Sequence, residues 1–167
     1  MPVLEHTMNR RTISALSAVA TLGFATLSLG QSARAADPTI AGTWELNLAA
    51  SKSTGPMPKS TTRIYEVVGN LEKMTGTIVT ADGKTVEVKF TATLDGKDSP
   101  FQFPGVDMLA LTPVDAWTTN FTTKLAGKVV ATGSRVLSND GKVMTQSTKG
   151  LNPAGKPSES TMVFDRR

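Results

Sequence analysis

The clearest structural signal in this chain is the stretch Thr85-Val86-Glu87-Val88-Lys89-Phe90-Thr91-Ala92-Thr93-Leu94. Its apolar residues fall at every second position, and polar or charged residues occupy the positions between them. Strict alternation is typical of a β-strand with one buried face and one solvated face. The stretch is bounded by Asp82-Gly83 and Asp95-Gly96. Because glycine accepts the positive φ of a tight hairpin turn, these pairs predict a strand between two hairpins.

The same turn signature recurs along the chain. A Gly-Lys pair begins at Gly83, Gly96, Gly127, Gly141 and Gly155. We interpret Asp82, Asp95 and Asp140 as turn formers, and no local run of acidic residues supplies the six to eight oxygens that Ca²⁺ requires. The segments between the turns predict nine strands, at roughly 42–48, 60–69, 71–80, 85–94, 107–112, 117–125, 128–138, 143–149 and 158–166.

Short connections between consecutive strands indicate an up-and-down antiparallel arrangement. A meander of eight or more strands leaves two unpaired edges unless it closes on itself. We therefore expect an all-β fold, an antiparallel up-and-down β-barrel of about 8–10 strands. The alternative, a β-sandwich, needs longer crossing connections. Residues 49–59 and 98–106 interrupt the alternation and are expected to be loops, which would form a lid if they lie at one end of the barrel.

The N-terminal segment has the pattern of an export signal. A basic pair, Arg10-Arg11, precedes an uncharged run from Ile13 to Leu29, and small residues flank position 34 in Ala33-Arg34-Ala35. This order is typical of a cleaved secretory signal. The run is shorter and less apolar than a spanning helix of about 20 residues, so no stable membrane anchor is expected. The sequence predicts a signal peptide at 1–35, a single domain at 36–167, and a periplasmic or extracellular location.

Two details of export stay open. The arginine pair is compatible with both the general secretory route and the twin-arginine route. Met8 is an alternative to Met1 as the true initiator, because it directly precedes the basic patch.

Removal of residues 1–35 changes the chemistry of the chain. It takes away His6, the single histidine, and the chain has no cysteine. This argues against Ser-His or Cys-His catalysis and against His/Cys zinc sites. Three arginines and one glutamate are also lost, which leaves 15 basic and 13 acidic residues and a charge of +2. The remaining basic residues are scattered, whereas nucleic-acid binding needs a clustered basic face. We expect no enzyme activity, no cofactor, no metal site and no nucleic-acid partner.

The first predicted strand carries the most specific motif. Gly42-Thr43-Trp44-Glu45-Leu46-Asn47, followed by Ser51-Lys52, resembles a group of secreted bacterial lipocalin-like proteins without an assigned function. The Gly-x-Trp element is similar to the opening motif of lipocalins and their calycin relatives. The resemblance implies that Trp44 closes the bottom of the barrel and that an arginine of the last strand packs across it. Arg166 is the candidate, since it shares a strand face with Phe164.

The leading functional hypothesis is an exported, non-catalytic barrel that binds a small apolar or amphipathic ligand. An eight-stranded barrel is just wide enough to fill with side chains or to hold one small ligand. Core packing would explain the candidate lining residues equally well. These candidates are Trp44, Tyr65, Phe90, Met108, Trp117, Phe121, Met144 and Phe164.

Arg63 is a further candidate, on the strand expected at 60–69. It shares a face with Tyr65, and Glu66 lies on the opposite face as the only acid considered for the interior. If the Arg63 face points inward, the guanidinium could bind the carboxylate of a ligand. Because strand exteriors are usually polar, the sequence favours the outward orientation for Arg63 and Tyr65.

The alternative hypothesis is a protein-interaction module, such as a small barrel inhibitor of a secreted protease. Its contact surface would be the loop 49–59 or the segment from Phe101 to Phe103, since exposed aromatic side chains often mark binding surfaces. Neither ligand identity nor oligomeric state follows from the sequence.

Overall fold

A computed structural model describes residues 38–152 and 155–167 of the chain, so the predicted signal peptide lies outside the described residues. The described part consists of β-strands and their connections. The strands are β1 (Gly42–Leu46), β2 (Lys52–Ser53), β3 (Ser60–Val68), β4 (Leu71–Val79), β5 (Thr85–Thr93), β6 (Ser99–Phe103), β7 (Val106–Pro113), β8 (Thr118–Leu125), β9 (Lys128–Leu137), β10 (Val143–Leu151) and β11 (Pro157–Arg166). No helix among these residues is long and apolar enough to cross a membrane.

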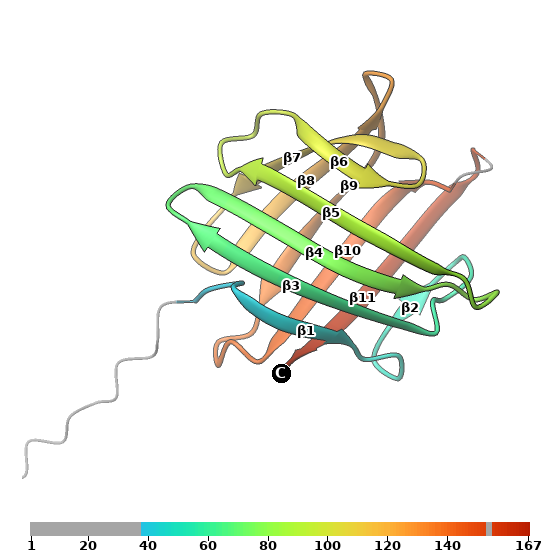
Figure 1. Cartoon of the computed structure of the whole chain (residues 1–167), viewed down its shortest axis with the longest axis horizontal. Helices are drawn as coiled ribbons and strands as arrows, with labels where there is room; N and C mark the ends of the chain where they lie inside the picture. The colour runs from blue at the N-terminus through green and yellow to red at the C-terminus, as the bar shows by residue number, and fades with distance from the viewer. Residues whose placement is uncertain (1–37, 153–154) are drawn as a thin grey trace, which may run out of the picture. The chain divides into compact units, whose positions relative to one another are not determined.

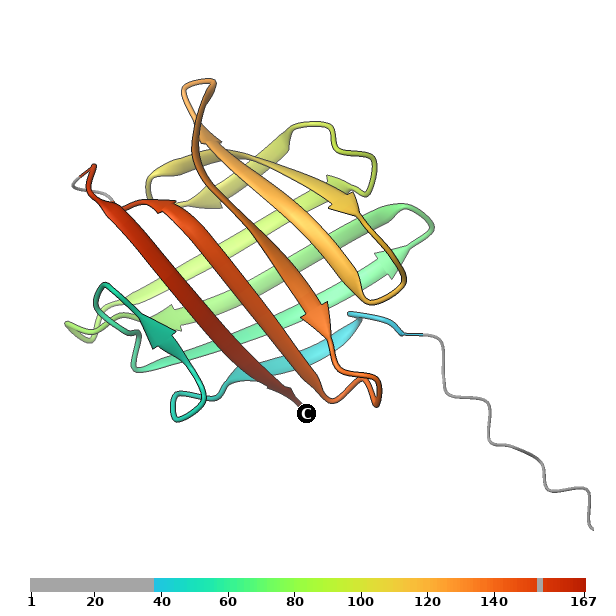
Figure 2. The ribbon, with the colours of Figure 1, turned by 180° about the vertical axis from the view of Figure 1, so that it is seen from behind.

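The strands form a closed antiparallel barrel. Neighbours in sequence pair with one another from β3 to β11, and β1 pairs with both β3 and β11. Ten strands therefore make the ring, and the short β2 attaches to β11 beside it. Trp44 marks the closing seam, because it lies opposite Arg63 on one side and Arg166 on the other. The predicted all-β up-and-down barrel is confirmed, and the sandwich alternative is wrong (Figures 1 and 2).

The repeated Asp-Gly elements form the turns that the sequence predicts. Gly83 and Gly96 have φ values of 89° and 78°, in the region that favours glycine. At the second turn, the Thr93 hydroxyl donates to the Asp95 carboxylate at 2.6 Å, and the Lys97 backbone N–H donates to the same oxygen at 3.2 Å. The Lys97 ammonium and the Thr93 hydroxyl together lower the pKa of Asp95 to about 2.

The predicted loop at 98–106 is wrong, since Ser99–Phe103 forms β6 and only a tight turn separates it from β7. The strand pairs with β5 at two positions, Lys89↔Gln102 and Phe90↔Phe101, and its register with β7 is irregular. Pro100 lies within this short strand, and proline weakens the sequence signal of a strand because it lacks the N–H donor.

The predicted loop at 49–59 also contains a strand. Residues Lys52 and Ser53 form β2, which pairs with Thr161 and Ser160 of β11. The half of β11 nearest the C-terminus pairs with β1 instead. The short β2 therefore extends the wall of the barrel where β1 has already ended.

The up-and-down order defines two ends of the barrel. The β3–β4, β7–β8 and β9–β10 connections lie at the end where the described chain begins, which we call the closed end (left and lower side of Figure 1). The segment 47–59 and the β4–β5, β6–β7 and β10–β11 connections lie at the other end, which we call the open end. Of the two segments expected to form a lid, 49–59 lies at the open end, whereas 98–106 runs along β6 and only its turn before Val106 reaches that end.

Candidate functional site

The closed end is plugged by Trp44, which is completely buried. The guanidinium carbon of Arg166 lies 4.4 Å from the centre of the Trp44 ring. Arg166 also donates hydrogen bonds to the backbone carbonyls of Gly141, Ala41 and Thr39, and the Trp44 indole donates to the Ile40 carbonyl at 2.8 Å. Trp44 and Arg166 therefore have the arrangement that the lipocalin resemblance implies, and together they hold the start of the described chain across the closed end.

The floor of the interior lies directly above this plug. Met144 and Phe164 are paired across β10 and β11 and are 0% and 1% exposed. The guanidinium carbon of Arg63 lies 4.4 Å from the centre of the Phe164 ring. Met144 and Phe164 are thus packed core residues, and the cationic side chain of Arg63 lies directly above them.

Arg63 and Tyr65 face into the barrel, so the outward orientation favoured by the sequence is wrong. Tyr65 is 3% exposed, whereas Ile64 and Val68 on the opposite face of β3 are 47% and 69% exposed. Arg63 is accommodated because its Nη1 donates to Gln146 Oε1 at 2.8 Å and to the Tyr65 hydroxyl at 3.5 Å. Polar residues can face a barrel interior when distant strands supply partners of this kind.

A glycine makes room for the Arg63 side chain. Gly76 lies directly opposite Arg63 on β4. A Cβ atom at Gly76 would lie 3.3 Å from Arg63 Cγ and 2.7 Å from the Thr62 carbonyl oxygen. Any larger residue at position 76 would therefore displace the arginine or the strand.

A second arginine inside the barrel is paired. Arg135 of β9 and Glu72 of β4 form two parallel contacts of 2.6 and 2.9 Å, and both residues are buried. Arg135 also lies 5.5 Å from the centre of the Tyr65 ring. Burial alone would lower the pKa of the Arg135 guanidinium, but the Glu72 carboxylate and Tyr65 outweigh it and raise this pKa. Arg135 is therefore a fixed, neutralised cation.

No sequence pattern predicted this ion pair, and Glu66, the acid considered for the interior, is not the one that faces inward. Glu66 lies with Ile64 on the exposed face of β3, and Glu72 is the acid that faces inward. Alternation could have indicated that both residues face inward, because Glu72 shares a strand face with Met74 and Arg135 shares one with Leu137. Both apolar neighbours are buried, but the pairing of two residues 63 positions apart has no local signature.

The two interior arginines differ in their charge balance. Glu72 neutralises Arg135, whereas Arg63 has no carboxylate partner among the described residues and contacts neutral oxygens. The Nε atoms of both side chains are buried and have no hydrogen-bond acceptor within the described chain. Arg63 is only half-buried, so its guanidinium can be reached from the interior space.

The remaining candidate lining residues fall into three groups. Phe90 and Phe121 are buried on the inner wall. Trp117 lies at the closed end, where it lines a pocket of 170 Å³ together with Glu72 and Arg135. The prediction that Met108 lines the interior is wrong. Leu109 and Leu111 form the inner face of β7, so the alternation places Met108 outside, where it is 36% exposed.

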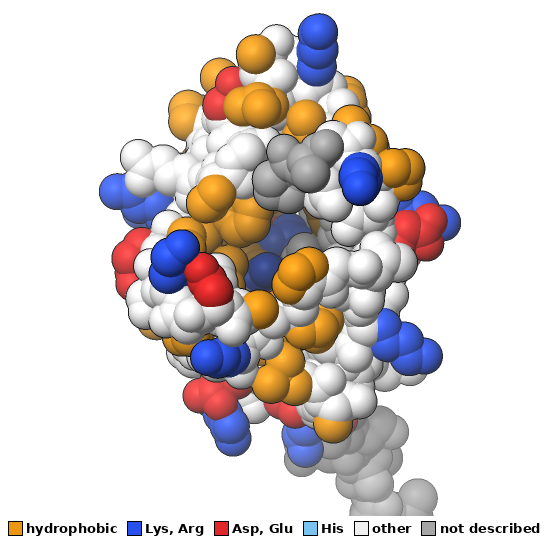
Figure 3. Space-filling model, turned by 90° about the vertical axis from the view of Figure 1, so that its right-hand side faces the viewer, with side chains coloured by type: hydrophobic (Ala, Val, Ile, Leu, Met, Phe, Trp, Pro, Cys, Tyr) orange, Lys and Arg blue, Asp and Glu red, His pale blue; other side chains and the backbone are white. Residues whose placement is uncertain are grey.

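The open end is hollowed. Figure 3 looks onto this end and shows a depression rimmed by hydrophobic side chains, with Lys or Arg atoms at its base. Ten strands enclose a wider interior than the eight that side chains just fill, because barrel diameter grows with strand number. The depression at the open end therefore lies above a packed floor of side chains.

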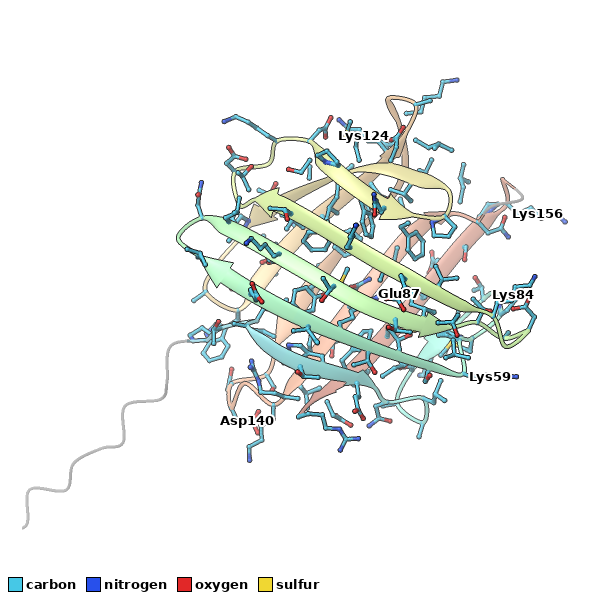
Figure 4. All side chains as sticks on the ribbon, in the orientation of Figure 1. Lys59, Lys84, Glu87, Lys124, Asp140 and Lys156 are labelled. Atoms are coloured by element: carbon cyan, nitrogen blue, oxygen red, sulfur yellow. The ribbon has the colours of Figure 1, made fainter. Side chains whose placement is uncertain are left out.

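Lysines surround this opening. Lys59, Lys84 and Lys156 project from the open end, and Asp140 lies at the other end (Figure 4). Lys84 pairs with Asp82 at 2.9 Å, and both groups are largely exposed. Lys59 and Lys156 have no carboxylate partner among the described residues, and such cations raise the local concentration of anions near an opening.

A larger depression of 480 Å³ lies outside the barrel wall, over β3 to β6. Exposed side chains such as Ile64, Lys73 and Pro100 contribute to its lining. It is wide open to solvent and lies on the face of these strands that carries Glu66, away from Arg63. No group of three or more metal-ligating side chains occurs among the described residues.

Comparisons with known proteins add little. No protein-family model matches the chain, and no curated protein matches it. Among solved structures, the chain is similar to zebrafish ileal bile acid-binding protein complexed with cholic acid, with a TM-score of 0.46 and 13% sequence identity. The match covers 76% of this chain and 98% of the zebrafish chain. A likeness this low supports no inference about function.

Proposed function

We propose that this protein is an exported, non-catalytic, lipocalin-like barrel that binds a small amphipathic molecule with an anionic head group. The observation that carries the proposal is Arg63, an interior cation without a carboxylate partner among the described residues. Taking a charge out of water is costly unless an opposite charge compensates it. The carboxylate of a ligand would supply this compensation by contacting the accessible part of the Arg63 guanidinium.

The surroundings of Arg63 favour an elongated molecule with an apolar body. The floor below Arg63 is closed by Phe164, Met144 and Trp44, so a bound molecule must extend toward the open end. Ile78, Val86 and Phe101 pack against the core from the upper inner wall. The lysines of the rim would attract the same anions from solution. Export remains part of the proposal, on the evidence of residues 1–35 alone.

The alternative of a protein-interaction module gains no comparable support. Phe101 faces into the barrel, where its ring contacts Phe90 edge-on at 5.6 Å. Phe103 stacks on Phe101 at 5.5 Å and is 37% exposed. The predicted pair of exposed aromatic side chains is therefore reduced to one.

Titration calorimetry with palmitate and with hexadecanol, its uncharged counterpart, tests the proposal. We expect the wild-type protein to bind palmitate about ten- to a hundredfold more tightly, since a hydrogen bond to a charged group contributes about 1.5–3 kcal/mol. Arg63→Gln should remove this preference. Lys73→Gln, which removes an exposed cation of the outer wall, is the matched control and should retain it. Equal affinity for both compounds in the wild type, or unchanged preference in Arg63→Gln, would refute the proposal.

A further inference from the structure

The two halves of the inner wall near the open end differ in chemistry. On one side, Ile78 of β4, Val86 of β5 and Phe101 of β6 are partly buried against the core. Val88, the next inward residue of β5, is 3% exposed. This side presents hydrocarbon and an aromatic ring to the interior.

The other side presents small hydroxyl side chains. Met144 and Phe164 fix the inward faces of β10 and β11, because both are buried and paired with one another. Alternation then places Thr148 of β10 and Ser160 of β11 inside, where they lie directly opposite each other. Ser158, opposite Gly150, continues this face toward the open end.

The two sides face each other across the interior. In the ring of ten strands, β10 is five strands away from β5, and β11 is five away from β6. Figure 1 shows β4 and β5 in front of β10 and β11, and Figure 2 shows β10 and β11 side by side from behind. A molecule in the interior therefore meets an apolar wall on one side and a hydroxyl wall on the other.

Two of the hydroxyl groups on this wall lack partners within the described chain, whereas the Ser158 hydroxyl lies 3.5 Å from the Thr54 hydroxyl. Neither Thr148 nor Ser160 makes a side-chain hydrogen bond to a described residue, and both are half-buried. Thr61, on the inner face of β3 two residues before Arg63, also makes none and is 4% exposed. Polar groups inside proteins are nearly always hydrogen-bonded to protein, water or ligand. These hydroxyls are therefore available to a bound molecule.

We propose that the ligand is a hydroxylated carboxylic acid whose hydroxyl group contacts Thr148 and Ser160 while its hydrocarbon contacts β4 to β6. This inference rests on the proposed function and adds the position of the hydroxyl. Thr148 lies two residues along β10 from Gln146, the partner of Arg63, which is a distance of ~7 Å. With carbon–carbon bonds of about 1.5 Å in a zigzag, the hydroxyl lies roughly six carbons from the carboxylate.

The experiment compares palmitate with three monohydroxy derivatives that carry the hydroxyl next to the carboxylate, near the sixth carbon, and at the far end. Calorimetry should show that the derivative hydroxylated near the sixth carbon binds about five- to tenfold more tightly than palmitate, the gain of one hydrogen bond. The other two derivatives should show no gain.

The variant Thr148→Val with Ser160→Ala should lose this gain and keep its affinity for palmitate. Thr145→Val with Thr161→Val changes the outward face of the same two strands and should keep the gain. Near-wild-type melting temperatures verify that both variants fold. Palmitate binding with no dependence on hydroxyl position, or a gain that survives Thr148→Val with Ser160→Ala, would overturn this inference alone. Absence of palmitate binding by the wild type would overturn the proposed function with it.

Discussion

The closed end and the open end of the barrel are built from the same alternating strands but from different kinds of side chain. At the closed end, large residues such as Trp44 and Phe164 are fully buried, and Arg166 ties the start of the described chain to the turn at Gly141. At the open end, the inner wall carries small hydroxyl residues such as Thr148 and Ser160. The stabilising contacts are concentrated at one end, which leaves the other free to keep polar groups and space for a ligand.

The buried ion pair between Glu72 and Arg135 should give the largest loss of stability. Arg135→Leu should destabilise the fold by about 3–5 kcal/mol, because it leaves the buried Glu72 carboxylate without its partner. The double variant Glu72→Leu with Arg135→Leu should recover most of this loss, since no buried charge is left. Urea denaturation measures both. If Arg135→Leu were as stable as the wild type, the ion pair between Glu72 and Arg135 would contribute nothing to the stability of the closed end.

Truncation of the plug is the next test. Trp44→Ala should cost about 3–5 kcal/mol, because a fully buried aromatic ring leaves a cavity. Phe101→Ala, its counterpart toward the open end, should cost only about 1–2 kcal/mol, since the ring is partly exposed. Thermal or chemical unfolding measures the loss of stability in each variant. Equal losses would contradict the view that stabilising contacts are concentrated at the closed end.

The Arg166 clamp should have an intermediate effect. Arg166→Lys keeps the positive charge but cannot bond three carbonyls as a guanidinium does, and we expect a loss of about 1.5–3 kcal/mol. Arg167→Lys is the control, because Arg167 is exposed and pairs with Glu45 on the surface. Its unfolding midpoint should not change measurably. A similar response from both variants would argue against the clamp.

The smallest effect concerns acid titration of a turn. Because the folded pKa of Asp95 is about 2, below its ordinary value of 3.8, its stabilising contribution is full above pH 4 and is lost as the pH falls toward 2. Carboxyl chemical shifts of Asp95 should therefore titrate near pH 2 in the wild type. Thr93→Ala with Lys97→Ala removes both side-chain donors and leaves only the backbone N–H of residue 97, so it should move the midpoint toward 3.8. An unchanged midpoint in this variant would assign the shift to another cause.

Much of the fold follows from short-range patterns. Alternation along 85–94 places Val88, Phe90 and Ala92 on one buried face, as observed. Asp-Gly pairs mark the hairpins, since few residues other than glycine accept their backbone conformation. β6 was missed because Pro100 and an irregular register weaken the alternation there.

Alternation and Asp-Gly turns predict a barrel of antiparallel strands, and the motif resemblance implies the contact between Trp44 and Arg166. The folded structure was needed to show that Arg63 faces inward, that Glu72 neutralises Arg135, and that Met108 lies outside. The physical reason is that alternation separates two faces without saying which is interior. That choice depends on closure of the ring and on partners from distant strands, such as Gln146 for Arg63, which no local pattern records.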